Sequence, residues 1–172
     1  MRVVHYPDPI LLSPAARVGV VTDEVRLKAL EMVPLMRLED GIGLAAPQVG
    51  WGVRLLVACR GGDDDAPIIL VDPEIIEKSG GLEEDQEGCL SFPGINGDIA
   101  RYRNVKVRAH DLENREVVVE AEDLFARVLQ HEIDHLDGVL FISRMSPADR
   151  QKSKPLLAEL VERHQKRSPD TP

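Results

Sequence analysis

The sequence contains no apolar stretch of the roughly 18 or more residues that a membrane span needs, so we expect no membrane contact. Its first residues, MRVVHYPDPILLSP, lack a charged segment leading into a long apolar run, so a secretory signal is not expected and we predict a cytoplasmic protein. An excess of positive charge is also missing, because the formal net charge is −9. That balance argues against a broad surface that grips phosphates, and we expect no direct DNA binding.

Cysteine is scarce, with Cys59 and Cys89 as the two examples. A structural disulfide would be unusual in a cytosolic protein. Cys59 ends the mostly apolar run 53–58, and we expect it to be a buried strand thiol. Cys89 stands among glycine and polar residues, which suits a reactive or metal-binding thiolate better.

Repeats, low-complexity tracts and internal linkers are absent from the sequence, and 172 residues are a normal length for one domain with one core. We therefore predict a single domain over 1–172. The spacing of apolar residues predicts helices over 23–38, about 123–138 and about 147–166, strands over 53–59, 68–76, 104–109 and 116–120, and a frayed tail over 167–172. Strands and helices do not alternate strictly, so the expected fold class is α+β.

The helix over 23–38 has an imperfect pattern. Leu27, Leu30 and Leu38 fall on one face, and Val33, Leu35 and Met36 widen the apolar surface. Thr22 or Asp23 is expected to cap its start, and Pro34 to kink it.

The sequence Gln130-His131-Glu132-Ile133-Asp134-His135 carries the strongest chemical signal, an H-E-x-x-H pattern within a predicted helix. One helical turn separates His131 from His135, so both imidazoles leave the helix on one face and can bind one metal. Glu132 can then reach a water at that metal, and Asp134 is expected to support the helix from outside the ligand set.

A catalytic metal needs a third protein ligand and an open position. Downstream of His135, neither the acidic residues nor His164 fit the spacing of a protease-type H-E-x-x-H site. Cys89, in the upstream sequence Glu-Gly-Cys-Leu-Ser, is a better candidate. One cysteine and two histidines would suit iron(II), zinc, cobalt or nickel. Two other functions stay open at this point, an endopeptidase and a binding module with a structural metal.

A glycine-rich segment, Gly41-Ile42-Gly43-Leu44-Ala45-Ala46-Pro47-Gln48-Val49-Gly50, adds a third motif. Its small residues let the backbone approach a ligand closely. Gln48 offers an amide donor of the kind that holds an oxyanion. The segment has neither the lysine of a P-loop nor the spacing of a dinucleotide-binding motif.

The three motifs G-I-G-L-A-A-P-Q, E-G-C-L-S and Q-H-E-I-D-H, in this order, resemble the signature motifs of peptide deformylases. HYPDPIL near the N-terminus and HLDGVLF after the helix resemble this family too. The resemblance implies an α+β fold whose strands pack around a central helix that carries H-E-x-x-H. It also implies a hydrolase that removes the formyl group from the initiator methionine of nascent polypeptides and releases formate. The metal in this family is usually Fe²⁺, and Zn²⁺, Ni²⁺ or Co²⁺ can replace it.

The resemblance also implies roles for individual residues. Glu132 would be the general base and acid, and Gln48 and the backbone N–H of Leu90 would hold the oxyanion. The remaining implied positions are the metal ligands Cys89, His131 and His135, the substrate-binding residues Ile42, Gly43, Glu87 and Gly88, and the supporting pair Asp40 and Arg101.

Two positions depart from what many relatives have. Asn96 stands near the place where many bacterial members carry an arginine that binds the peptide backbone, which puts that contact in doubt. Arg127 stands where some relatives have an apolar residue near the methionine pocket, and we expect it to be an exposed helix residue.

The last predicted helix is basic. Residues 150–167 contain six positive side chains, with Glu159 and Glu162 as the negative ones. Leu156, Leu157, Leu160 and Val161 form an apolar stripe for the core. This arrangement suggests either weak docking on ribosomal RNA through phosphates or a solvated helix that only covers the core.

Overall fold

The computed structural model describes residues 1–60 and 66–167 of the chain. Its elements are, in order, α1 (Asp23–Leu38), β1 (Gly43–Ala45), β2 (Leu55–Ala58), β3 (Ile68–Gly88), β4 (Asn96–His110), β5 (Glu116–Glu122), α2 (Asp123–Leu136) and α3 (Pro147–Arg167), with three short 3₁₀ helices at Pro9–Leu12, Ala46–Val49 and Phe141–Ser143. None of the helices in the described part of the chain has both the length and the apolar character that crossing a bilayer requires.

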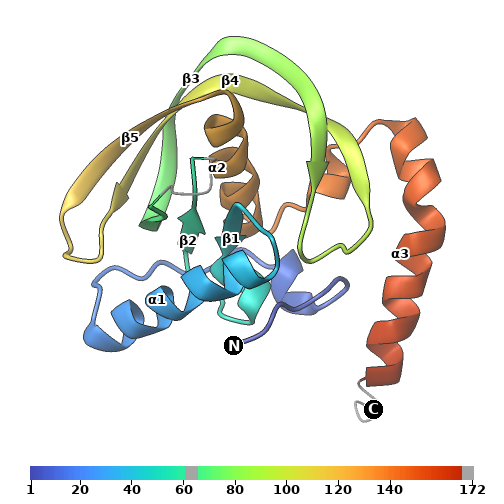
Figure 1. The fold of residues 1–172 in the computed structure, drawn as a ribbon, viewed down its shortest axis with the longest axis horizontal. Coiled ribbons are helices and arrows are strands. Elements are labelled where there is room, and N and C mark those ends of the chain that lie inside the picture. The colour runs from blue at the N-terminus through green and yellow to red at the C-terminus, as the bar shows by residue number, and fades with distance from the viewer. Residues whose placement is uncertain (61–65, 168–172) are drawn as a thin grey trace.

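The strands form one antiparallel five-stranded sheet in the order β1-β2-β3-β4-β5. β3 and β4 make a long curved hairpin that arches around α2 (Figure 1). The pairing of β3 with β4 shifts register between Val71 and Glu74, between Ile75 and Glu77 and between Ser79 and Leu82. Such bulges bend a strand, which lets the hairpin curl over the helix.

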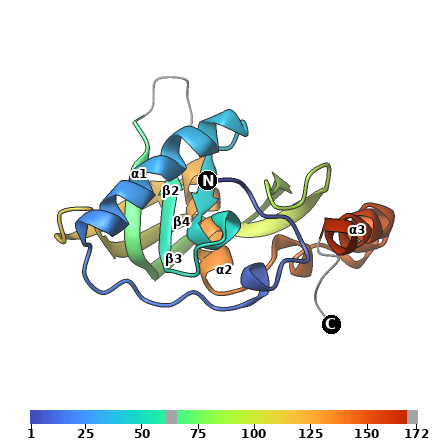
Figure 2. The same ribbon diagram turned by 90° about the horizontal axis from the view of Figure 1, so that it is seen from below.

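Helix α2 lies in the centre of the molecule, beneath the arch of β3 and β4 (Figures 1 and 2). All residues from Phe125 to Leu136 are buried. Leu129 and Ile133 pack against Val107 of β4 and Leu56 of β2 in one apolar cluster. The expected α+β fold, with strands packed around the helix that carries H-E-x-x-H, is confirmed.

Helix α1 has the predicted bounds, but of the apolar residues named for it only Leu35 and Met36 are buried. The helix begins after Thr22, whose side chain accepts a hydrogen bond from the backbone N–H of Val25. Leu27, Leu30 and Leu38 are 65%, 48% and 78% exposed. The buried residues are Ala29, Met32, Leu35 and Met36, which pack in a cluster that also contains residues of β2.

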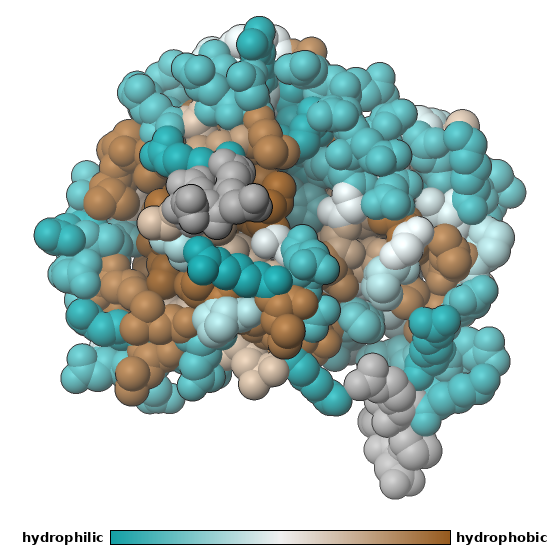
Figure 3. Space-filling view, in the orientation of Figure 1, coloured by the Kyte–Doolittle hydropathy of each residue, from teal (hydrophilic) through white to brown (hydrophobic). Residues whose placement is uncertain are grey.

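The buried side of α1 packs with Leu55 and Val57 of β2, whereas Leu27, Leu30 and Leu38 face outward. Apolar side chains gather on the surface over the part of the molecule where α1 lies (Figure 3). Cys59 was expected to be a buried thiol, and it is 8% exposed in the same cluster as Met32.

Helix α3 lies at one side of the molecule, apart from α1 and α2 (Figure 1). Leu160 is buried and Leu157 partly buried in a cluster with Phe92 and Phe141, whereas Leu156 is 39% exposed. Only part of the expected apolar stripe is therefore buried against the core. The helix continues to Arg167, and the tail predicted to fray lies, beyond that residue, outside the described residues.

Candidate metal centre

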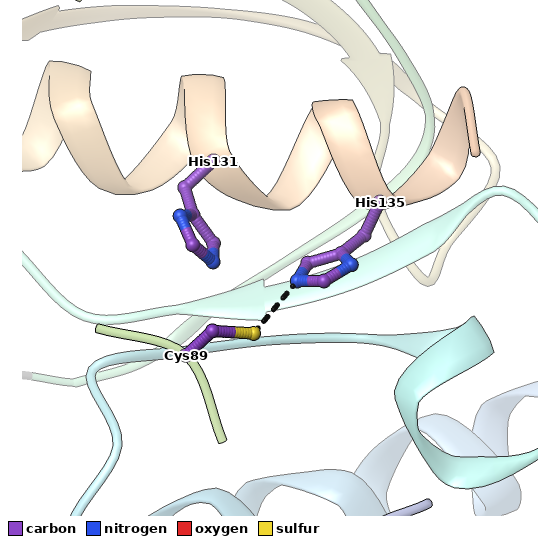
Figure 4. A group of neighbouring side chains, drawn as sticks. All are labelled: Cys89, His131 and His135. Carbon is purple, nitrogen blue, oxygen red and sulfur yellow. Dashed lines mark hydrogen bonds between the residues drawn. The ribbon is translucent and has the colours of Figure 1, made fainter. Parts of the chain in front are cut away.

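Three side chains that could hold a metal ion converge where α2 passes the end of β3. His131 and His135 leave the same face of α2, and Cys89 follows Gly88, the last residue of β3 (Figure 4). The ligand atoms of these three residues all lie within 4.8 Å of one another, and Cys89 Sγ is 3.2 Å from His135 Nε2. Within residues 1–60 and 66–167 no fourth His, Cys, Asp or Glu joins this group.

The surroundings of the two histidines differ electrostatically. Burial alone lowers the pKa of His131, but hydrogen bonds with Cys89 and Glu87 outweigh burial and raise it to about 10. Burial and the nearby charge of His131 hold the pKa of His135 well below its ordinary value. The thiol and carboxylate beside His131 thus favour positive charge at this point, and a metal cation would displace a proton there. Neutral His135 is already in the form that ligates a metal.

Glu132 is buried beside these three residues and lines the cleft described below, which Cys89 and His131 also line. Its Oε2 atom is buried and has no hydrogen-bond partner among the described residues. Burial raises the pKa of Glu132 to about 7, partly offset by the charge of His131. A carboxylate whose pKa lies near neutrality can both take and return a proton. The donor set and this free carboxylate oxygen therefore fit a catalytic metal rather than a closed structural site.

Gln48 occupies the short helix Ala46–Val49, at the end of β1, and is buried. The Ala45 N–H donates to Gln48 Oε1 at 2.8 Å, which fixes the orientation of the amide. Gln48 Nε2 then donates to Ser91 Oγ at 3.4 Å and to Cys89 Sγ at 3.5 Å. The amide N–H groups of Gln48 therefore face Cys89, one of the candidate ligands.

A cleft of about 580 Å³ gives access to these side chains. All the predicted site residues except Arg101 and His135 line this cleft. Those that line it are Asp40, Ile42, Gly43, Gln48, Glu87, Gly88, Cys89, Leu90, His131 and Glu132. Asn96, Leu124, Arg127 and Val128 also border it. Motifs that are far apart in the sequence thus share one accessible space.

The predicted pair of Asp40 and Arg101 is wrong. Arg101 is buried, and its ion pairs in the described chain are with Glu87 and Asp134. Asp40 is exposed at the end of α1 and has φ of 56°. A buried guanidinium needs buried acceptors, which Glu87 and Asp134 provide and the exposed Asp40 does not.

Glu87, expected to bind substrate, has both carboxylate oxygens engaged within the protein. Oε1 accepts from Arg101 Nε at 2.9 Å, and Oε2 accepts from Arg101 Nη2 at 3.0 Å and lies 2.9 Å from His131 Nδ1. Burial alone raises the pKa of Glu87, but hydrogen bonds with His131 and Arg101 lower it to about 2. The carboxylate is thus a charged partner of a candidate metal ligand.

Arg127 was expected to be exposed, and that prediction is wrong. It is 8% exposed and forms an ion pair with Glu87. Two further residues escaped the sequence analysis. Arg144 donates two hydrogen bonds to Asp134, and Ser91 contacts Gln48. Ser91 lies within the E-G-C-L-S motif, which was a usable signal, whereas no periodic pattern connects Arg144 with Asp134.

The buried H-E-x-x-H helix, the cysteine beside it and the cleft that opens onto both define a metallohydrolase of α+β fold. The sequence model of polypeptide deformylase matches residues 1–151. The chain is 40% identical to the peptide deformylase of Desulforudis audaxviator over 151 residues, which cover 88% of this chain and 97% of that protein. It is 46% identical to peptide deformylase 1 of Bacillus subtilis over 145 residues, which cover 84% and 89%.

A solved structure, the crystal structure of Arabidopsis thaliana peptide deformylase 1B in complex with an inhibitor, superposes with a TM-score of 0.93. It is 36% identical in sequence, and the match covers 99% of this chain and 95% of that one. The chain belongs to the polypeptide deformylase family.

Proposed function

We propose that Cys89, His131 and His135 hold one divalent metal ion and that Glu132 and Gln48 act beside it in deformylation. As a member of its family the chain is an enzyme that removes the N-formyl group from the initiator methionine of nascent polypeptides and releases formate. The observation that carries the residue assignment is the convergence of the three ligand atoms within 4.8 Å, at a cleft also lined by Glu132 and Gln48.

When bound, the metal would lower the pKa of a water towards neutrality and polarise the formyl carbonyl. One thiolate and two imidazoles form a soft donor set that suits Fe²⁺, Zn²⁺, Ni²⁺ or Co²⁺. We assign Fe²⁺ as the metal in the cell, following the family resemblance, with the other three as substitutes. Three protein ligands leave a fourth position for the reaction.

Glu132 takes the proton of the attacking water and gives it to the departing amine. Support comes from its burial, its pKa of about 7 and its unpaired Oε2. Glu132→Gln keeps the shape but cannot accept a proton. We expect retained metal, near-normal substrate binding and a loss of turnover of about 100-fold or more. Turnover at the wild-type rate would contradict this role.

Gln48 and the backbone N–H of Leu90 stabilise the negative charge that develops on the formyl oxygen. Gln48 supports this role because its Oε1 is fixed by Ala45 and its Nε2 points to Cys89 and Ser91. One such donor typically contributes about 3 kcal/mol to the stabilisation of the transition state. Ile42, Gly43 and Gly88 are proposed to contact the peptide, since they border the cleft beside these donors.

Measuring substrate choice tests the proposed function. The purified protein is given three substrates in turn. They are a formyl-Met peptide, the same peptide without the formyl group, and a longer peptide that has no formyl group and offers only internal peptide bonds for cleavage. We expect formate from the first and no cleavage of the others. Cleavage of internal bonds without formate release would favour an endopeptidase. A bound metal without either reaction would favour a structural site.

We place the enzyme in the cytoplasm, where formyl-Met N-termini first emerge from the ribosome, and propose weak docking of α3 on ribosomal RNA. The basic residues of 150–167 support docking, although Arg163 and Lys166 form exposed ion pairs with Glu159 and Glu162. Such contacts weaken with salt. Arg163→Glu combined with Lys166→Glu should reduce co-sedimentation with ribosomes at low salt, whereas Lys106→Glu with Arg108→Glu on the sheet should not. Equal pelleting of both double variants would contradict docking through α3.

A further inference from the structure

Arg127 links α2 to both strands of the long hairpin. It lies one helical turn before His131 and is 8% exposed. Its Nη1 donates to Glu87 Oε1 at 2.8 Å and to the Ile99 carbonyl at 2.7 Å, and its Nη2 donates to the Glu83 carbonyl at 2.8 Å. Glu83 belongs to β3 and Ile99 to β4. One guanidinium therefore fixes the two strands and Glu87 relative to the helix.

Glu87 stands between Arg127 and a candidate metal ligand. Its Oε1 accepts from Arg127 and Arg101, and its Oε2 lies 2.9 Å from His131 Nδ1. A carboxylate at the nitrogen that does not bind the metal fixes the ring orientation and strengthens the ligand. Arg101 holds Glu87 from β4, and Arg127 holds it from α2 itself. Because Arg127 also borders the cleft beside Val128, it connects the wall of the cleft with the metal ligands.

We propose that Arg127 is a positioning residue for the metal centre, which orients His131 through Glu87. The proposal rests on the proposed metal site and adds to it a residue that is not itself one of the proposed ligands. Arg101 already forms hydrogen bonds with both carboxylate oxygens of Glu87. The Glu83 and Ile99 carbonyls hold the Arg127 guanidinium in place. The guanidinium in turn holds Glu87 Oε1 and so sets the angle at which Glu87 meets His131.

The test replaces Arg127 with methionine, which keeps the apolar stem and removes the guanidinium. Metal-free wild type and Arg127→Met are titrated with Co²⁺, whose absorption reports the thiolate ligand and the coordination geometry. We expect the variant to bind Co²⁺ about 10-fold to 100-fold more weakly, the usual effect of losing an outer partner of a ligating histidine. Its Co²⁺ spectrum should differ from that of wild type. With saturating metal, kcat for a formyl-Met peptide should fall while KM stays close to the wild-type value.

Arg103→Met is the matched control, because Arg103 forms an exposed ion pair with Asp123 at the start of the same helix and does not touch Glu87. It should leave Co²⁺ affinity and spectrum unchanged. If Arg127→Met does not fold, Arg127→Lys serves instead, since one ammonium group cannot reach all three acceptors, and it should also bind Co²⁺ more weakly.

Equal Co²⁺ affinity and spectra for wild type and the Arg127 variant would overturn the positioning role, as would a higher KM with unchanged Co²⁺ binding. An equal loss of Co²⁺ affinity in Arg103→Met would also overturn the positioning role. The loss would then follow from removing any positive charge near α2, and not from the contact of Arg127 with Glu87. If wild type itself bound no Co²⁺, the proposed metal site would fail, which distinguishes that failure from the failure of the role of Arg127.

Discussion

At Gly43 the backbone passes close to the proposed base, Glu132. A Cβ atom at this position would lie 2.4 Å from Glu132 Oε1 and 2.9 Å from Glu132 Cγ. Such distances are too short for any side chain, so Gly43→Ala must displace the Glu132 carboxylate. We expect turnover to fall by at least about 10-fold, part of what a positioned base contributes, with unchanged metal content.

Gly52→Ala is the control for that substitution, because its Cβ would have its nearest neighbour, Ile10 Cδ1, at 3.8 Å, an ordinary contact distance. Formate release under saturating substrate measures both variants. A Gly43→Ala enzyme as fast as Gly52→Ala would mean that the position of Glu132 does not limit the reaction.

At the residue scale, the sequence was enough to predict those features of the site that depend on local backbone geometry. Helical spacing alone puts His131 and His135 on one face. The partners of Arg127 and Arg101 depend on how the hairpin bends over α2, and no local pattern encodes that bend. Arg127 was therefore assigned to solvent, and Arg101 was paired with Asp40. Both errors concern long side chains, whose charged ends can reach partners on other elements.

At the scale of elements, α1 gives a direct test of which face holds the fold together. Met32 is fully buried, whereas Leu27 is 65% exposed. Met32→Ala should lower the free energy of unfolding by about 2–5 kcal/mol, because it leaves a cavity in the cluster between α1 and β2. Leu27→Ala should change it by less than about 0.5 kcal/mol. Urea unfolding measures both, and the opposite order would contradict the role of the buried face of α1.

The turn between β4 and β5 depends on Asp111, whose carboxylate accepts hydrogen bonds from the backbone N–H groups of Glu113 and Arg115 and from the Arg115 guanidinium. The backbone hydrogen bond from Arg115 is the largest cause that lowers the pKa of Asp111 below its ordinary value. Because the pKa is lower in the folded state, this carboxylate stabilises the fold above its unfolded pKa, and the contribution is lost as the pH falls through its folded pKa.

Asp111→Asn should therefore lower the Tm at neutral pH, and the gap to wild type should shrink between about pH 5 and about pH 3. Thermal unfolding over this range measures the gap. A gap that stays constant with pH would show that the charge of Asp111 does not contribute.

Helix bounds were easier to predict than strand lengths. α1 has the predicted range because Thr22 caps it and apolar residues recur through it. The strand predicted over 68–76 continues to Gly88 in β3, across Gly80, Gly81 and a run of acidic residues. These residues have low strand propensity, and their pairing with β4 outweighs it. Propensity cannot show that pairing, because it depends on the register of another strand.

At the scale of the whole molecule, the order of the elements was enough to predict the α+β class. The sequential sheet order and the curl of the β3–β4 hairpin around α2 were not predictable, because they follow from packing and from bulges. The prediction of one domain over 1–172 stays a prediction. The curl has a chemical consequence, since it brings Glu87 and Cys89 at the end of β3 to the histidines of α2.

Metal content measured together with formate release, on protein purified without air, tests the central claim most directly. Wild type should contain one divalent metal ion per chain and release formate from a formyl-Met peptide. Cys89→Ala should lose both, because no fourth ligand among the described residues can replace the thiolate. Cys59→Ala, which removes the other, buried thiol, should keep both. Full metal content and full activity in Cys89→Ala would contradict the assignment of the metal centre.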